Sequence, residues 1–297
     1  PNLTSVAVGD FNKDGKLDFA TSALNEVLWF EMPGRTRRVI KKAGGALDNV
    51  LGLAHEALDV DGDSNLDLLS LETTKTLVWY EGPTPATTED WKRHLIADNL
   101  GAASELAVGD TDADGKPELI VHGTDGLLAF KPPANAKADP KWEPRLLSKE
   151  VGGALHALQF ADVNGDQRMD LMAASASEGT VNWWNTATNW KRHPLVTGLV
   201  GISNAALEDL DDDGRSDLVV ALGHSAGLFW YRRGGPAPAR RKPPLLLPGT
   251  RLTVVSLRLP NTSNPPEANS PPPPAKAAPD RAVTGHASRP TAGRPAS

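Results

Sequence analysis

Asp10-Phe-Asn12-Lys-Asp14-Gly15-Lys-Leu-Asp18 is the first copy of an acidic nine-residue loop that occurs five times along this chain of 297 residues. Carboxylates or amides occupy positions one, three, five and nine of the loop. Successive copies begin 49, 51, 52 and 47 residues apart. A nearly fixed period of this size indicates a repeat architecture, so the fold has to be interpreted from the repeat.

The oxygen-bearing side chains of the loop suit a calcium ion, which binds about six to eight oxygen ligands. We expect side-chain ligands at positions one, three, five and nine and a backbone carbonyl at position seven. The five predicted ligand sets are Asp10, Asn12, Asp14, Lys16, Asp18; Asp59, Asp61, Asp63, Asn65, Asp67; Asp110, Asp112, Asp114, Lys116, Glu118; Asp162, Asn164, Asp166, Arg168, Asp170; and Asp209, Asp211, Asp213, Arg215, Asp217.

The alternative to a metal site is that Asp, Asn and Gly simply form turns. That interpretation explains one copy as well as calcium does, but it does not explain five copies in register. Several carboxylates within one short loop also repel one another unless a cation is present. The sequence therefore predicts up to five calcium ions, one for each repeat.

The loop is not an EF-hand, which needs a bidentate Glu at position twelve and a helix on each side. Position twelve here is Thr21, Ser70, Val121, Ala173 or Val220. The flanking segments are short apolar runs bounded by Gly and Asp, which are typical of strands. Each loop is thus predicted to join two antiparallel strands.

The copies differ at the position where an EF-hand uses glycine for a sharp turn. Position six is glycine in the first, third and fifth loops, but it is Ser64 or Gln167 in the second and fourth. Those two loops have Gly62 or Gly165 before the third ligand instead. Glu118, which is longer than Asp, makes the third loop the least regular.

Each loop is followed by a strand, a turn of small residues and an aromatic strand such as Val27-Leu-Trp29-Phe30-Glu31. A fourth segment follows in most repeats, as in Trp91-Lys-Arg-His94-Leu-Ile96, and all eight tryptophans occupy one of these two repeated positions. Four strands in a repeat of this length are typical of a β-propeller blade. We expect the aromatic residues to pack between blades, and the alternative is a platform for a ligand.

Together these motifs resemble the FG-GAP/VCBS repeat family, which is also similar to the N-terminal propeller of integrin alpha chains. The resemblance covers Asn2 to about Arg232 and rests on the acidic loop, W-[FY]-E and W-K-R-H-x-I. It implies a propeller, commonly of seven blades, with calcium bound between the first two strands of a blade at the positions given above. The chain departs from the family pattern in its number of repeats, in the two missing position-six glycines and in Glu118.

The predicted fold is an all-β propeller of four-stranded blades, with five repeats at about 1–50, 51–101, 102–153, 154–201 and 202–232. Five blades of a larger ring would leave two open strand edges, and we interpret the chain as part of such a ring in preference to a five-bladed one. Residues 233–297 are basic and proline-rich, which predicts a disordered tail with a possible strand at 251–259.

The charge is distributed unevenly along the chain. Residues 1–231 carry 20 basic and 35 acidic side chains, whereas residues 232–297 carry 11 basic and 2 acidic ones. Eighteen of the acidic residues are predicted ligands, so the acidity of the repeats indicates metal binding. Nucleic acid is excluded as a partner of the propeller, because phosphate binding needs a basic patch. No apolar run approaches the about twenty residues of a membrane span.

Two functions from different classes are consistent with these features. The first is a noncatalytic binding module stiffened by calcium, with a protein or carbohydrate ligand on the face opposite the calcium loops. The second is a carbohydrate-active lyase or dehydratase, since some enzymes resemble this repeat family. That second function needs catalytic groups in the central channel, for which only His55 and His156 are candidates.

No catalytic residue or organic cofactor is predicted. Gly223–Gly227 fits G-x-S-x-G, but that motif needs a strand followed by a helix, and here another predicted strand follows. An extracellular, periplasmic or cell-surface location is expected, because extracellular calcium modules bind with Kd values on the order of 10⁻⁴ to 10⁻³ M. Sites of that strength would be mostly empty in the cytosol.

Overall fold

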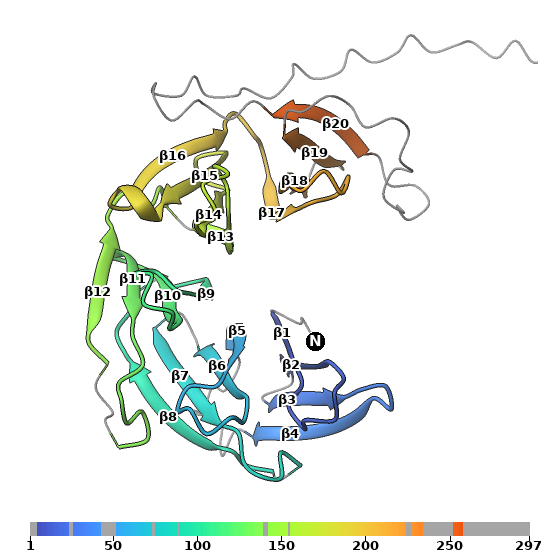
Figure 1. Cartoon of the computed structure of the whole chain (residues 1–297), viewed down its shortest axis with the longest axis vertical. Helices are drawn as coiled ribbons and strands as arrows, with labels where there is room; N and C mark the ends of the chain where they lie inside the picture. Colours follow the sequence, from blue (N-terminus) through green and yellow to red (C-terminus); the bar gives the residue numbers. More distant parts are fainter. Residues whose placement is uncertain are drawn as a thin grey trace, which may run out of the picture.

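The computed structural model describes residues 5–23, 26–42, 52–72, 75–87, 89–101, 103–138, 142–153, 155–223, 227–233 and 252–257. These residues form five sheets of four strands each, arranged as the blades of a propeller (Figure 1). The predicted all-β propeller with four-stranded blades is therefore confirmed. Apart from β20, the tail beyond residue 233 lies outside the described residues.

The strands follow one another in chain order within each blade. The first blade contains β1 (Val6–Gly9), β2 (Asp18–Ala23), β3 (Glu26–Glu31) and β4 (Thr36–Lys42). The second contains β5 (Gly52–Leu58), β6 (Asp67–Glu72), β7 (Thr76–Glu81) and β8 (Lys92–Ala97). The third contains β9 (Leu106–Gly109), β10 (Glu118–Gly123), β11 (Gly126–Phe130) and β12 (Pro144–Ser148). The fourth contains β13 (Leu155–Ala161), β14 (Asp170–Ser175), β15 (Thr180–Asn185) and β16 (Lys191–Val196), with a short 3-10 turn at Thr186–Thr188. The fifth contains β17 (Ile202–Glu208), β18 (Asp217–Leu222), β19 (Gly227–Arg233) and β20 (Leu252–Leu257).

Each acidic loop closes the hairpin between the first two strands of its blade. Position nine is the first residue of the second strand and pairs with the residue that precedes the loop, as Gly9 pairs with Asp18 and Leu58 with Asp67. The loops therefore lie at equivalent places in all five blades, as the repeat predicts.

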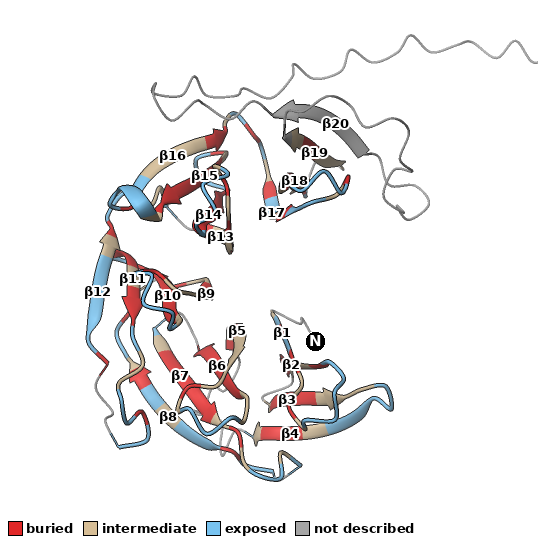
Figure 2. Cartoon of the chain, viewed as in Figure 1, coloured by how far each residue is buried: buried red, intermediate tan, exposed pale blue. Residues whose placement is uncertain are grey.

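The hydrophobic cores lie between blades. Successive residues of a strand point to opposite faces, so that Leu68 packs toward the first blade and Leu69 toward the third. Four cores join the first blade to the second, the second to the third, the third to the fourth and the fourth to the fifth. All eight tryptophans are buried, and all of them except Trp230 belong to these four cores, as the sequence predicts. Figure 2 shows burial concentrated in the middle strands of the blades and exposure along outer strands such as β4 and β12.

The fifth blade differs from the others in its outermost strand. β20 pairs with β19 in parallel, whereas the fourth strand of every other blade is antiparallel to the third. A short turn can join only antiparallel neighbours, but residues 234–251 separate these two strands and leave either direction accessible. β20 falls within the segment where the sequence predicts a strand.

The five blades follow an arc in Figure 1, with the fifth blade and the first at its two ends. The described residues form no hydrophobic core between these two blades, in contrast to every other pair of neighbours. Val6 and Val8 of β1 are accordingly exposed. The number of blades in the whole ring stays a prediction.

Candidate metal centre

Every acidic loop is wrapped around the carboxylate at its first position. In the first loop, Asp10 accepts hydrogen bonds from the backbone N–H groups of Asp14 (3.0 Å) and Gly15 (2.8 Å). Asn12 accepts a second bond from Asp14 N–H (3.0 Å), and Asp14 accepts one from Lys16 N–H (2.9 Å). Equivalent bonds to the first and fifth positions recur in the other four loops. Both oxygens of the position-one carboxylate thus order the loop, as in Asp10, whereas the position-five carboxylate accepts a backbone N–H through one oxygen.

Two positions of every loop adopt left-handed backbone conformations. Position six has φ between 68° and 82° in all five loops, including Ser64 and Gln167. Position four has φ between 54° and 84°, and it is glycine in the second and fourth loops, at Gly62 and Gly165. Glycine favours this conformation, and each loop has one glycine at one of the two positions. The loops that lack the position-six glycine therefore have the same backbone as the others, a regularity that the sequence did not predict.

Position nine is buried in all five loops. In the second loop, Asp67 Oδ2 accepts the N–H of Val60 (2.8 Å) and Oδ1 accepts the N–H of Gly82 (2.7 Å). The same pair of contacts ties Asp18 to Phe11 and Met32. The ninth residue thus joins its own loop to the segment that follows the third strand, a structural role beyond the predicted ligation.

Burial raises the pKa of the Asp67 carboxyl to about 7; the nearby carboxylates of Asp61 and Asp63 contribute to this rise, and the two backbone N–H groups oppose it. Burial likewise raises the pKa of Asp170 to about 6. A cation beside these groups would favour their ionised forms.

Within the described part of the chain, three loops bring carboxylates close enough together for one ion. Ligand oxygens lie within 4.8 Å of one another in each of the groups Asp59, Asp61 and Asp67; Asp110, Asp112, Asp114 and Glu118; and Asp209, Asp211 and Asp213. The first and fourth loops have Asn12 or Asn164 at position three, where the other loops have a carboxylate.

The oxygen donors of these groups fit a hard divalent cation. Glu118 Oε1 and Asp211 Oδ1 are buried and accept no hydrogen bond, and a buried carboxylate oxygen normally has a partner. Calcium takes oxygen ligands from Asp, Glu and backbone carbonyls. Ligation by the individual residues of the five predicted sets stays a prediction.

Three basic side chains that the sequence did not single out contact these groups. Lys137 lies at the second loop, Lys131 at the third and Arg232 at the fifth. Lys131 and Arg232 both follow the last aromatic residue of a third-strand motif, Phe130 or Tyr231, so the sequence contained a signal in their shared repeat position. Lys137 lies between β11 and β12 of the third blade, and its place in the repeat does not indicate that it contacts the loop of the second blade.

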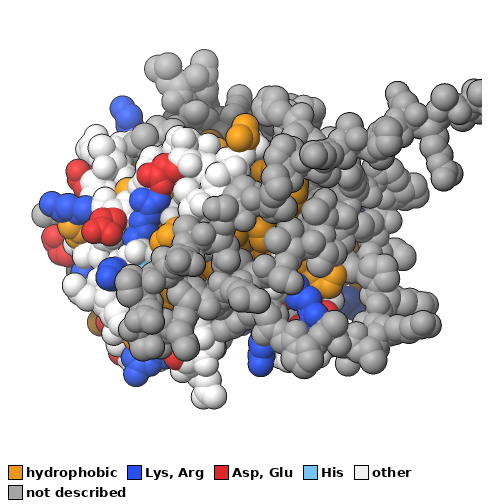
Figure 3. All heavy atoms as spheres, turned by 90° about the horizontal axis from the view of Figure 1, so that it is seen from above, with side chains coloured by type: hydrophobic (Ala, Val, Ile, Leu, Met, Phe, Trp, Pro, Cys, Tyr) orange, Lys and Arg blue, Asp and Glu red, His pale blue; other side chains and the backbone are white. Residues whose placement is uncertain are grey.

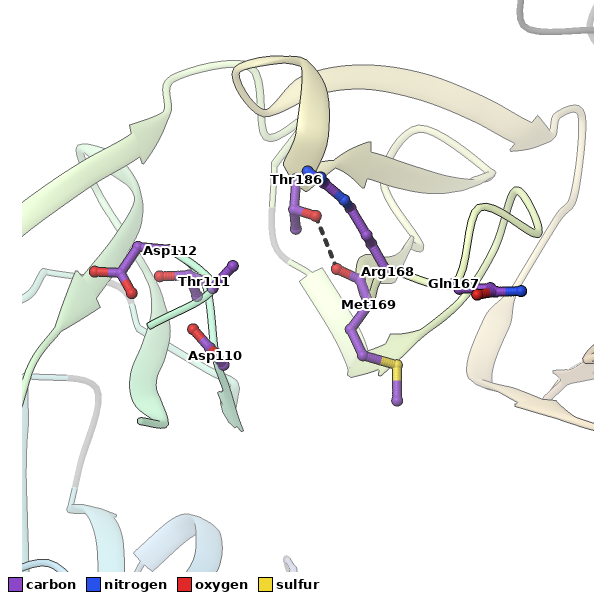
Figure 4. Close-up of a pocket in the computed structure, with 8 residues that line it drawn as sticks. Asp110, Thr111, Asp112, Gln167, Arg168, Met169 and Thr186 are labelled. Atoms are coloured by element: carbon purple, nitrogen blue, oxygen red, sulfur yellow. Dashed lines mark hydrogen bonds between the residues drawn. The ribbon is translucent and has the colours of Figure 1, made fainter. Parts of the chain in front are cut away.

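A pocket with a cavity volume of about 370 Å³ lies between the third and fourth loops. In Figure 4, Asp110, Thr111 and Asp112 line one side of it, and Arg168, Met169 and Thr186 line the other. Thr186 Oγ1 donates a hydrogen bond to the backbone carbonyl of Met169 (2.9 Å). The pocket is therefore on the face that carries the acidic loops, whereas the sequence suggested a ligand on the opposite face.

The two histidines considered for catalysis differ in position. His55 is buried, and its Nε2 lies 2.7 Å from Ser22 Oγ of the first blade. The N–H of Gly52 donates to the same hydroxyl oxygen (3.0 Å), and burial lowers the pKa of His55 to about 4, which favours the neutral imidazole. His55 therefore connects two blades and cannot reach a substrate. His156 is half-buried, with Nδ1 3.8 Å from Glu105 Oε1.

The described surface offers no single-signed patch on the side seen in Figure 3, where basic and acidic side chains are intermixed. Among the described residues, no helix has the length and apolar character needed to cross a bilayer.

Residues 59–121 and 162–220 match the FG-GAP-like repeat family, and residues 2–31 match the FG-GAP repeat family. No curated protein sequence matches the chain significantly. The structure is similar to a lectin from Agrocybe aegerita that recognises non-reducing terminal N-acetylglucosamine, with 17% identity and a TM-score of 0.50 over 72% of this chain and 59% of the lectin chain.

Two other solved structures are similar to the chain at lower scores. The biofilm matrix protein Bap1 of V. cholerae has 18% identity and a TM-score of 0.42 over 74% of this chain and 35% of Bap1. A chain of a nidogen/laminin complex has 12% identity and a TM-score of 0.48 over 77% of this chain and 75% of that chain. This chain thus spans less than two thirds of the lectin and about a third of Bap1.

Proposed function

Because the chain carries FG-GAP and FG-GAP-like repeats, we propose that it is a calcium-binding propeller that acts outside the cytosol as a noncatalytic interaction module. The observation that carries the calcium proposal is the convergence of carboxylate oxygens within 4.8 Å in three equivalent loops. The bonds from backbone N–H groups order these loops before any metal is bound, which reduces the entropy lost on binding.

In this proposal, the side chains of positions one, three, five and nine and the carbonyl of position seven hold the ion. Calcium supplies charge neutralisation and stiffens the hairpin between the first two strands of each blade. The first and fourth loops bind through an Asn at position three and are included in the proposal, for a total of up to five ions.

The calcium proposal is tested by titrating the metal-free chain with calcium in a calorimeter and by following thermal unfolding with and without chelator. We expect binding with a Kd on the order of 10⁻⁴ to 10⁻³ M and a lower Tm in chelator. Asp14→Ala should remove the site of the first loop. Asp125→Ala removes an equally exposed acid from a turn outside the loops and should leave the stoichiometry unchanged. No calcium uptake by the wild-type chain would refute the proposal.

The interaction role is preferred over the lyase or dehydratase alternative because His55, one of the two histidines considered for catalysis, is buried. The partner proposed is a carbohydrate or a protein. The fold is that of a lectin which recognises terminal N-acetylglucosamine, and a pocket of about 370 Å³ lies in the range of ligand sites.

A glycan array probed with the calcium-loaded chain tests the carbohydrate partner. Met169→Glu introduces a charge into the pocket between the third and fourth loops and should abolish binding there. If a glycan is bound equally well by this variant, the ligand lies elsewhere, and the face opposite the calcium loops becomes the site. Binding to no glycan favours the protein partner.

A further inference from the structure

One repeat position is acidic in two blades, basic in two and neutral in one. It follows the last aromatic residue of the third-strand motif and is, in chain order, Glu31, Glu81, Lys131, Asn185 and Arg232. The position lies beside the acidic loop, because it is at the end of the strand next to the one that the loop enters. A basic residue at this position therefore reaches the carboxylates of its own blade.

In the third blade, the Lys131 ammonium lies 2.5 Å from Asp114 Oδ2, 3.0 Å from Asp112 Oδ2 and 3.6 Å from Glu118 Oε1. These three residues belong to one of the groups that could hold a metal ion. The ammonium group thus neutralises the oxygens that a calcium ion would need.

In the fifth blade, the Arg232 guanidinium is paired with Asp211 and lies 3.7 Å from Asp213 Oδ2. Asp211 is buried, and a buried carboxylate needs a partner of opposite charge. Arg232 supplies that charge from the same repeat position as Lys131.

In the second blade the corresponding residue is acidic, and the cation comes from the neighbouring blade. The Lys137 ammonium lies 2.8 Å from Asp61 Oδ2, 3.4 Å from Asp63 Oδ2 and 2.8 Å from Glu81 Oε1. Glu81, Asp61 and Asp63 thus bind a lysine of the third blade. This contact joins two blades and also neutralises carboxylates of the second loop.

The first and fourth blades have no cation at this position. Glu31 is paired with Arg38 of its own sheet (2.8 Å). Asn185 accepts a hydrogen bond from the N–H of Ala187 (2.9 Å) and caps the 3-10 turn. Both residues are occupied within their own blade, and neither one brings positive charge to a loop.

We propose that Lys131, Lys137 and Arg232 are resident counter-cations of the third, second and fifth loops, and that a calcium ion must displace them to bind there. The inference rests on the proposed calcium function. It concerns the three loops whose carboxylates are paired with a cation from outside the loop, whereas in the first loop the only cation paired with a predicted ligand among the described residues is Lys16 of the loop itself, 3.2 Å from Asp14 Oδ2. It also implies that the propeller keeps part of its stability when calcium is withdrawn.

The competition is expected to be modest, because Lys131 and Lys137 are partly exposed and exposed ion pairs are weak. A loop that is open only part of the time binds with an apparent Kd raised by the inverse of the open fraction. For a pair of ordinary strength, this factor is about fivefold. The effect should shrink at high salt, which screens exposed pairs.

The first test uses the wild-type chain and therefore needs no variant to fold. Lysines are acetylated briefly in chelator and in calcium, and the modified positions are measured by mass spectrometry. Lys131 and Lys137 should react about fivefold faster in calcium than in chelator, because the ion releases their ammonium groups. Lys149 is an exposed lysine of the third blade with no ion pair among the described residues, and it should react equally in both. If Lys131 and Lys137 are acetylated at the same rate in calcium as in chelator, the inference is wrong.

The second test titrates calcium into Lys131→Met and Lys137→Met, with Lys131→Arg and Lys149→Met as controls. Each Met variant should bind calcium about fivefold more tightly at one site and should unfold at a lower temperature in chelator. Lys131→Arg keeps the cation, and Lys149→Met loses a distant one, so both should resemble the wild type. If the wild type binds calcium but the Met variants bind no more tightly, this inference fails and the proposed function survives. If no protein binds calcium, both fail.

Discussion

Replacement of Asp67 by Ala should destabilise the propeller even when no calcium is present. Asp67 is 0% exposed and accepts the backbone N–H groups of Val60 and Gly82 at 2.8 and 2.7 Å. The substitution leaves both N–H groups buried without a partner. Each such loss costs about 1–3 kcal/mol, so the free energy of unfolding should fall by about 2–6 kcal/mol.

Asp63 provides the matched comparison, because it is a predicted ligand of the same loop but its side chain is partly exposed, whereas that of Asp67 is buried. Its side chain is 33% exposed and interacts with Lys137 and with the backbone of Asn65. Asp63→Ala should therefore cost little in chelator, at most about 1 kcal/mol. In calcium it should lose the stabilisation that the second loop gains from the ion.

Urea unfolding of both variants and the wild type, each in chelator and in calcium, separates the two roles. The expected pattern is a large loss for Asp67→Ala under both conditions and a loss for Asp63→Ala that depends on calcium. If Asp67→Ala matches the wild type in chelator and differs only in calcium, position nine is a ligand alone and the structural role assigned to it is wrong.

Two further predictions concern the contacts between blades. Burial lowers the pKa of His55 from 6.5 to about 4, so the unfolded chain binds a proton first as the pH falls, and stability present above pH 6.5 is lost toward pH 4. Relative to His55→Gln, the free energy of unfolding of the wild type should fall by about 2 kcal/mol between about pH 7 and about pH 5. Burial raises the pKa values of Glu56 and Glu105 to about 7, and their titration changes stability in the opposite direction. The comparison with His55→Gln removes this contribution because both proteins contain these two residues. A difference that does not vary with pH in denaturant titrations would contradict this. Trp79 is fully buried between the second and third blades and stacks on a histidine ring at 4.2 Å, so Trp79→Ala should cost about 3–5 kcal/mol. Its indole N–H has no partner, and Trp79→Phe should cost much less; equal losses in urea unfolding would show that the N–H matters after all.

Much of the architecture was predictable because it depends on local and periodic features. The acidic loop marks the hairpin between the first two strands, since position nine is the first residue of the second strand in every blade. The tryptophans at two repeated positions predicted cores between blades, and all of them except Trp230 are buried in such cores. Strand alternation and turn chemistry act over a few residues, so one copy of the repeat is sufficient to specify one blade and five copies specify five.

Other features depended on contacts between residues far apart in the chain. The sequence predicted Asp67 as a ligand, but only the paired strands show that it also binds the backbone of Gly82. The parallel direction of β20 follows from a connection too long to impose a hairpin. Lys137 meets Asp61 across the boundary between two blades, 76 residues apart along the chain. Such contacts are set by how blades pack against one another, and a repeat pattern describes a blade without its neighbours.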